Sequence, residues 1–189
     1  MAIKLEERTA PTPHDMLSRA RRRFMRREKL DINSLAAELG ISRATAYRWA
    51  GNVEELTGVV IASLAADTFR RALNEAEGTG ADRLVDMFRR GTTYMSGGPY
   101  RDWVRREDPE TVLRMVASRF GPVQGTTIRL WEELLDEELR CGRLDLPVDS
   151  HTMAYTIVRL GESFLYADLI AGEEPDIEAC VEIVKLLLR

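Results

Sequence analysis

The feature that most constrains the fold is a pair of short helical segments separated only by Gly40, Ile41 and Ser42. The first segment, 33–39, ends at Gly40, because glycine readily adopts the left-handed backbone of a helix C-terminus. Ser42 can cap the second helix, since its hydroxyl accepts a hydrogen bond from a backbone N–H of the first turn. Apolar residues lie at spacings that pack the two helices together: Leu35, Ala36, Leu39, Ile41 and Ala46. This spacing predicts a helix-turn-helix.

The second helix of this motif leaves polar side chains facing outward. Arg43, Thr45, Tyr47 and Arg48 suit phosphate groups and base edges in the major groove of DNA. The alternative interpretation is an ordinary helical hairpin with a polar exposed face.

Charge is distributed unevenly along the chain. Residues 1–52 hold eleven Lys and Arg against six Asp and Glu, whereas residues 53–189 hold sixteen against twenty-five. A basic first quarter fits a polyanionic partner, with phosphate contacts supplying much of the affinity. Within the run Arg19–Lys29, Phe24 and Met25 indicate a supporting helix with one buried edge. Taken alone, such a run also fits a solvated helix face.

The stretch 35–42, Leu-Ala-Ala-Glu-Leu-Gly-Ile-Ser, followed by Thr-Ala-Tyr at 45–47, resembles the DNA-binding domain of TetR-type repressors. In that family the stretch reads approximately I-A-x-x-A-G-V-S-x-x-T-L-Y-x-H-F. The resemblance covers residues 13–58. It implies groove contacts from one helix and phosphate contacts from the helix before it. The residues so implied are Arg43, Ala44, Thr45, Tyr47 and Arg48 at the groove, and Asn33 and Ser34 at phosphates.

The chain departs from this family pattern at two places. Trp49-Ala50 replaces the usual His-Phe pair, and Val53 replaces a Lys that contacts phosphate. We expect Trp49 to take the role of the lost aromatic residue and include it in the DNA interface.

The fold class is predicted to be all-α, because no strand-like alternation exceeds four residues. Residues 1–52 are predicted to form the three-helix DNA-binding domain, and 53–189 a ligand-binding and dimerisation domain. The expected helices of the second domain are 53–77, 81–95, 100–106, a helix from Pro109 to Phe120, one reaching Arg140, 150–171 and 176–188. Asp108 before Pro109, and Asp149 or Ser150, are the expected N-caps.

Composition bears on compartment and cofactors. The sequence has no 18-residue apolar run and no apolar core of a signal peptide at its N-terminus. Cys141 and Cys180 have no metal-ligand spacing, and two cysteines are too few for a disulfide framework. We expect a cytoplasmic protein without cofactor, metal or membrane segment.

The last two predicted helices carry wide apolar stripes, which favour a homodimer formed by two such hairpins. Gly161 would allow close approach of backbones. The predicted interface residues are Ile157, Gly161, Phe164, Val181, Val184 and Leu188. The alternative is that these helices pack entirely against their own body. A two-fold dimer would match inverted operator half-sites.

Aromatic residues and methionines in the middle helices, interrupted by glycines, resemble the lining of a ligand cavity. An ordinary core would have a similar composition. The predicted ligand-binding residues are Trp103, Phe120, Gln124, Trp131, Arg159 and Tyr166, with Tyr94, Thr127 and Glu162 as further polar candidates. An apolar ligand with one carbonyl or lactone head would suit them.

The body also resembles QsdR-like TetR-type regulators of quorum-signal degradation, which respond to lactones. The likeness rests on Asp108–Arg114, Phe120–Gln124 and Leu144–Asp149, and covers residues 100–188. It implies a lactone as a candidate effector.

No enzyme motif stands out. His14 and His151 lack partners at metal-ligand spacing, Gly161-Glu162-Ser163 lacks the second glycine of a nucleophile elbow, and Gly78-Thr79-Gly80 lacks a following Gly-Lys. The sequence therefore predicts a dimeric, ligand-responsive repressor of a palindromic operator that is not an enzyme. The alternative is a ligand-independent architectural DNA-binding protein, against which the long body argues.

Overall fold

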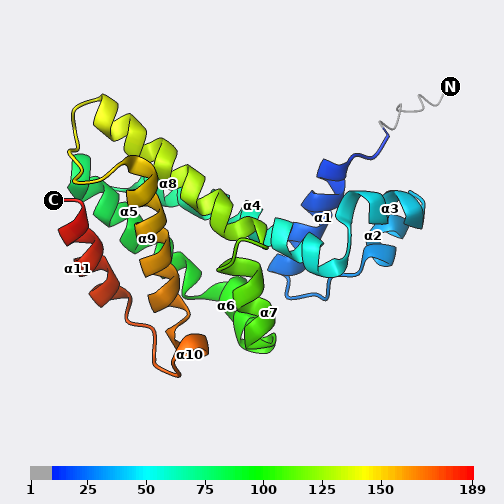
Figure 1. The fold of residues 1–189 in the computed structure, drawn as a ribbon. Coiled ribbons are helices and arrows are strands. Elements are labelled where there is room, and N and C mark those ends of the chain that lie inside the picture. The colour runs from blue at the N-terminus through cyan, green and yellow to red at the C-terminus, as the bar shows by residue number, and fades with distance from the viewer. Residues whose placement is uncertain (1–9) are drawn as a thin grey trace. The chain divides into compact units, whose positions relative to one another are not determined.

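The computed structural model describes residues 10–189, which form helices joined by turns, with no strand among them (Figure 1). The predicted all-α class is confirmed. The helices are α1 Pro13–Met25, α2 Ile32–Leu39, α3 Arg43–Ala50, α4 Val53–Glu75, α5 Gly80–Met95, α6 Gly98–Arg106, α7 Pro109–Val116, α8 Pro122–Arg140, α9 Ser150–Leu165, α10 Ala167–Ile170 and α11 Ile177–Leu187. The expectation about a signal peptide concerns the extreme N-terminus and lies outside the described residues.

The chain divides into two compact units, and the division falls inside α4, between Thr57 and Gly58. We call residues 10–57 the head and residues 58–189 the body. The domain boundary expected from the sequence, 52/53, coincides with the start of α4. The structural division falls later, after the first turn of α4.

Local hydrogen bonds set the ends of the three head helices. Asp31 caps α2, accepting from the backbone N–H of Ser34 at 2.7 Å. Gly40 has φ +68°, the left-handed conformation that ends α2. Ser42 Oγ accepts from the N–H of Thr45 at 3.1 Å and starts α3. The predicted turn is therefore confirmed in its glycine and in its cap.

Helix α1 contributes three buried side chains to the core of the head, those of Met16, Ala20 and Phe24. Met25 is 49% exposed, so the predicted buried edge is correct for Phe24 and wrong for Met25, the last residue of the helix. Arg23 forms an ion pair with Glu38 of α2. Part of the basic run is therefore paired within the head.

In the body, α9 packs between α8 and α11, and α11 also packs on α5 (Figure 1). The apolar core comes from these helices and from α4: Phe69, Ala72, Leu84, Val85, Met87, Phe88, Trp131, Leu134, Leu135, Met153, Ala154, Ile157, Val158, Cys180, Val181, Val184 and Leu188. Burial of this apolar surface is the main stabilising contribution to the body. Cys180 is buried in this core and Cys141 is exposed at the end of α8; both thiols are free.

Two body helices end more than two residues before the predicted position. The helix from Pro109 ends at Val116, because the chain turns back tightly before α8: a Cβ at Gly121 would lie 1.9 Å from the Met115 carbonyl oxygen. The predicted helix 150–171 is broken at Tyr166, which leaves the helical conformation and separates α9 from α10. The predicted caps Asp108 and Asp149 are confirmed.

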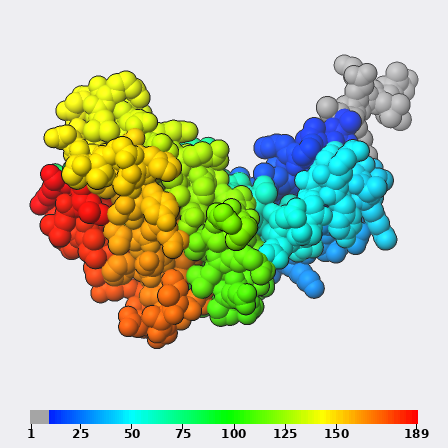
Figure 2. Space-filling model, viewed as in Figure 1, coloured from blue at the N-terminus to red at the C-terminus, as the bar shows by residue number. Residues whose placement is uncertain are grey.

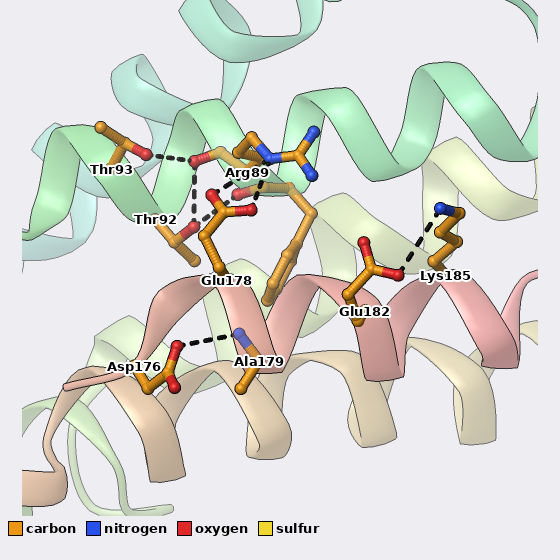
Figure 3. A network of polar contacts seen from close by, with 9 residues as sticks. Arg89, Thr92, Thr93, Asp176, Glu178, Ala179, Glu182 and Lys185 are labelled. Carbon is orange, nitrogen blue, oxygen red and sulfur yellow. Dashed lines mark hydrogen bonds and ion pairs between the residues drawn. The ribbon is translucent and has the colours of Figure 1, made fainter.

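Polar contacts begin the last helix, α11, and orient it on α5 (Figure 3). Asp176 caps α11 by accepting from the N–H of Ala179 at 2.9 Å. Arg89 Nε of α5 donates to both carboxylate oxygens of Glu178, each at 3.2 Å (Figure 3). These groups are exposed, so the pair orients α11 more than it stabilises it. No helix within residues 10–189 is long and apolar enough to cross a bilayer.

Candidate functional site

The outer face of α3 is the candidate DNA interface. Ala46 and Ala50, four residues apart, are buried against the head core and leave the opposite face of the helix exposed. Arg43, Ala44, Tyr47 and Arg48 are exposed, whereas Thr45 and Trp49 are half-buried. The structure therefore brings the residues predicted for the groove together on one helix.

The two arginines of α3 are available for an external partner. Within the part of the chain that the structure describes, neither Arg43 nor Arg48 has an ion-pair partner, unlike Arg19 and Arg23 of α1, which pair with Glu38. The guanidinium of an arginine without an internal partner can bind a phosphate or the edge of a guanine without first breaking an ion pair within the protein.

Asn33 and Ser34, predicted to contact phosphates, lie in the first turn of α2. Asn33 is half-buried and Ser34 is exposed. The Ser34 hydroxyl donates to Asp31 Oδ1 at 2.6 Å, and this bond together with the backbone N–H holds the pKa of Asp31 below its usual value. A phosphate contact by the Ser34 hydroxyl would have to replace its bond to Asp31.

The body contains a partly open cavity of about 100 Å³. It is lined by residues of α4, α5, α8 and α9, with single contributions from the end of α7 and from Tyr166: Ala65, Thr68, Phe69, Ala72, Met87, Phe88, Gly91, Thr92, Met95, Val116, Val123, Thr127, Trp131, Ile157, Val158, Gly161, Glu162, Leu165 and Tyr166. The lining is mainly apolar, and small residues on facing helices leave the space. Such a lining is typical of small-molecule sites.

Trp131 forms the aromatic wall of this cavity. Its ring contacts Phe69 edge-to-face, with ring centroids 5.6 Å apart, and lies 6.2 Å from the ring of Phe88. These contacts orient the indole in the cavity wall.

Glu162 is the charged group of the lining. Its carboxylate accepts from Gln124 Nε2 at 3.1 and 2.9 Å and from Arg159 Nη1 at 2.7 Å. Burial raises the pKa of Glu162, and the bonds from Gln124 and Arg159 oppose that effect. Arg159 Nη1 also donates to the carbonyl of Ala117, at the end of α7, at 3.0 Å. Glu162 thus links α9 to α8, and Arg159 links α9 to the end of α7.

Tyr166 closes another part of the cavity wall, and its hydroxyl is hydrogen-bonded to that of Tyr100 on α6. Burial raises the pKa of both phenols. Beside them, buried Arg101 donates from Nη2 to Asp168 Oδ2 at 2.6 Å. These two contacts join α6 to Tyr166, between α9 and α10, and to α10 itself.

The six residues predicted to bind ligand fall into three groups. Trp131 and Tyr166 line the cavity, while Gln124 and Arg159 hold Glu162 in its wall. Trp103 is buried against Tyr100 and Phe120 is 77% exposed, and neither is part of the lining.

The sequence reasoning did not find the contribution of α4 to the lining, such as Phe69 and Ala72, or that of Phe88 on α5. The available signal on α4 was its small residues, Ala65 and Ala72, placed among bulkier ones. That signal becomes specific only when the helices are known to face one another.

The residues predicted for the dimer interface are mostly buried within one chain. Ile157, Gly161, Val181, Val184 and Leu188 are covered by the body core, and a Cβ at Gly161 would lie 3.3 Å from the ring of Phe88. These five therefore offer no surface to a second copy, while Phe164 is half-buried. The close approach expected at Gly161 is made to α5 of the same chain.

The fold and these two regions define a class, that of all-α regulators with a helix-turn-helix head and a cavity-bearing body. A family model described as the tetracyclin repressor-like C-terminal domain matches residues 79–189. Because this match spans more than half of the chain, the chain belongs to the TetR family and is a TetR-family transcriptional regulator.

Solved structures agree with this assignment. The TetR-family transcriptional repressor QsdR from R. erythropolis is 29% identical, with a TM-score of 0.86 over 94% of this chain and 96% of that one. The repressor AlkX from Dietzia sp. strain DQ12-45-1b, implicated in n-alkane biodegradation, is 20% identical over 96% and 100%, with a TM-score of 0.63. The fatty acid degradation regulator FadR from Bacillus halodurans is 16% identical over 96% of each chain, with a TM-score of 0.51.

The predicted resemblance of the body to QsdR-like regulators is confirmed by the first of these structures. The other two show the fold alone. A comparison with curated protein sequences finds no match.

Proposed function

We propose that this chain is a cytoplasmic, ligand-responsive repressor that binds a palindromic operator as a homodimer and releases it when a small apolar effector enters the body cavity. The observation that carries the proposal is one chain with both an exposed α3 bearing two unpaired arginines and an apolar cavity in its body. A lactone is the candidate effector class, on the strength of the QsdR-like sequence of the body.

A homodimer would use the outer faces of α9 and α11. The two helices pack together, and their surfaces lie side by side in Figure 2. Four exposed apolar side chains mark this region: Tyr155 on α9, Ile170 on α10, and Ile183 and Leu186 on α11, the last 75% exposed. Large apolar side chains exposed on neighbouring helices favour a protein partner, and a second copy would supply the second head that inverted half-sites need.

The cavity can influence α4, the helix that continues into the head. Arg159 donates both to Glu162 in the cavity wall and to the carbonyl of Ala117, the first residue of the turn 117–121. After that turn, Pro122 packs on α4, where a Cβ at Gly58 would lie 3.0 Å from Pro122 Cδ. An effector that moves Glu162 would therefore shift the turn against α4. The change in operator affinity could be no larger than the effector's differential affinity for the two states.

The direct test is a gel shift with the DNA upstream of the gene itself, with and without a panel of lactones and acyl compounds. We expect specific binding that one compound class abolishes. Arg48→Ala should weaken the shift, whereas Arg70→Ala on α4 of the body should leave it unchanged. Binding without sequence preference would instead indicate the architectural alternative.

A further inference from the structure

Glu162 is an unusual group to find in an apolar cavity. It is the single ionisable carboxylate of the lining, and no Lys, Arg or His side chain belongs to the cavity walls as described. Its side chain is 11% exposed and keeps a charged partner, Arg159, behind it. A buried carboxylate costs free energy unless its lone pairs are satisfied, so its hydrogen bonds can be counted.

The carboxylate of Glu162 can accept one more hydrogen bond than the structure gives it. A carboxylate offers about four acceptor positions. Gln124 Nε2 uses one on each oxygen, and Arg159 Nη1 uses a second on Oε2. Oε1 therefore retains an unused acceptor position on a side chain that lines the cavity.

Charge complementarity restricts what can bind there. An anionic head would meet the carboxylate and find no cation in the lining, because the Arg159 Nη1 group already serves Glu162 and the Ala117 carbonyl. A cationic head would bring an additional charge beside an ion pair that is already balanced, in a space where desolvation is costly. A neutral donor would complete the hydrogen bonding of Glu162 without adding charge.

We infer that the effector is an uncharged molecule whose apolar part fills the space beside Trp131 and whose head donates a hydrogen bond, from a hydroxyl or an amide N–H, to Glu162. This inference rests on the proposed function, since it describes the occupant of the cavity through which the repressor would respond. A lactone satisfies it only when it also carries an O–H or N–H group. Molecules with a free carboxylate are excluded.

The test compares compounds that share one chain and differ only in the head, titrated calorimetrically into the full-length protein without DNA. Hexanol is paired with its methyl ether, and hexanamide with its N,N-dimethyl derivative, because methylation removes the donor and keeps the acceptor. Hexanoate and hexylamine supply the charged heads. We expect each donor compound to bind about tenfold more tightly than its methylated partner, and hexanoate and hexylamine to bind more weakly than hexanol.

Two variants locate the effect. Glu162→Gln should reduce the preference for hexanol over its ether and improve hexanoate binding, because the negative charge is gone. Glu178→Gln makes the same change on the surface of α11 and should leave all affinities unchanged. If Glu162→Gln does not fold, as judged by circular dichroism, the comparison of compounds on the unchanged protein still decides the matter.

The inference is overturned if hexanoate or hexylamine binds as tightly as hexanol, if methylation has no effect, or if none of the compounds binds. The gel shift with upstream DNA tests the proposed function independently of these binding measurements. Specific DNA binding that an anionic compound abolishes would preserve the repressor and discard this class of effector.

Discussion

The head and the body use polar side chains in opposite ways. In the head, Arg43, Tyr47 and Arg48 face outward and leave packing to Ala46 and Ala50. In the body, the polar groups Arg101, Glu138 and Glu162 are buried or nearly so, and each binds other groups of the same chain. Polar substitutions on the outer face of α3 should therefore change function and spare stability, whereas substitutions of these buried polar groups in the body should change stability first.

Removing the partner of Arg101 should produce the largest loss of stability. Asp168→Ala leaves a guanidinium that is 6% exposed without its carboxylate. We expect the free energy of unfolding to fall by about 3 kcal/mol, since an uncompensated buried charge remains. Urea denaturation followed by circular dichroism measures it. Asp82→Ala, which removes a carboxylate 78% exposed beside Arg189, is the matched control and should cause no measurable change.

The pH dependence of stability should identify Glu138. Hydrogen bonds from Arg143 hold the pKa of this carboxyl below its ordinary value of 4.5, and its side chain is 2% exposed. Because the folded pKa is lowered, Glu138 contributes stability that is present above pH 4.5 and lost as the pH falls through the lower, folded value.

Glu138→Gln should flatten the acid side of the stability curve and cost about 2 kcal/mol at neutral pH. This is less than for Asp168→Ala, because Arg143 is 42% exposed and can return to water. A variant that kept the full acid dependence of the original protein would assign that dependence to another carboxyl group.

On the head, Arg48→Ala and Tyr47→Ala should each weaken operator binding about tenfold at moderate salt, since each removes a contact to phosphate or base. Their unfolding curves should coincide with that of the unchanged protein, because both side chains are exposed. An unfolding midpoint that shifts together with DNA affinity would contradict the separation between head and body.

Ser42→Ala is a head substitution that should change both stability and DNA binding. The Ser42 hydroxyl caps α3, so its loss should cost about 1 kcal/mol of head stability and also weaken DNA binding, through fraying of the helix. Ser163→Ala, whose hydroxyl donates to the Arg159 carbonyl on the surface of α9, is the control and should change neither quantity.

The turn at Gly40, the cap at Ser42 and the helix starts at Asp108 and Asp149 could be read from the sequence because each depends on residues a few positions away. The cavity could not, because its walls come from helices that are distant in the sequence. Phe120 shows the difference: it is aromatic and follows an apolar helix, yet the tight turn at Gly121 leaves it exposed.

The apolar stripe of α11 shows the same limit for surfaces. Val181, Val184 and Leu188 follow the helical period, but periodicity does not say whether the covering surface belongs to the same chain or to another. The structure assigns these residues to the body core and leaves Ile183 and Leu186 exposed.

The two free thiols differ enough to give the protein a built-in attachment point. Cys180 lies in the body core, where burial raises its pKa to about 11, so it is protected from alkylating reagents. Cys141 is exposed at the end of α8. A maleimide fluorophore or nitroxide should thus label each chain once without mutagenesis. Pulsed electron resonance on a homodimer would then give one distance between the two labels, and a change on adding effector would report movement of the bodies directly.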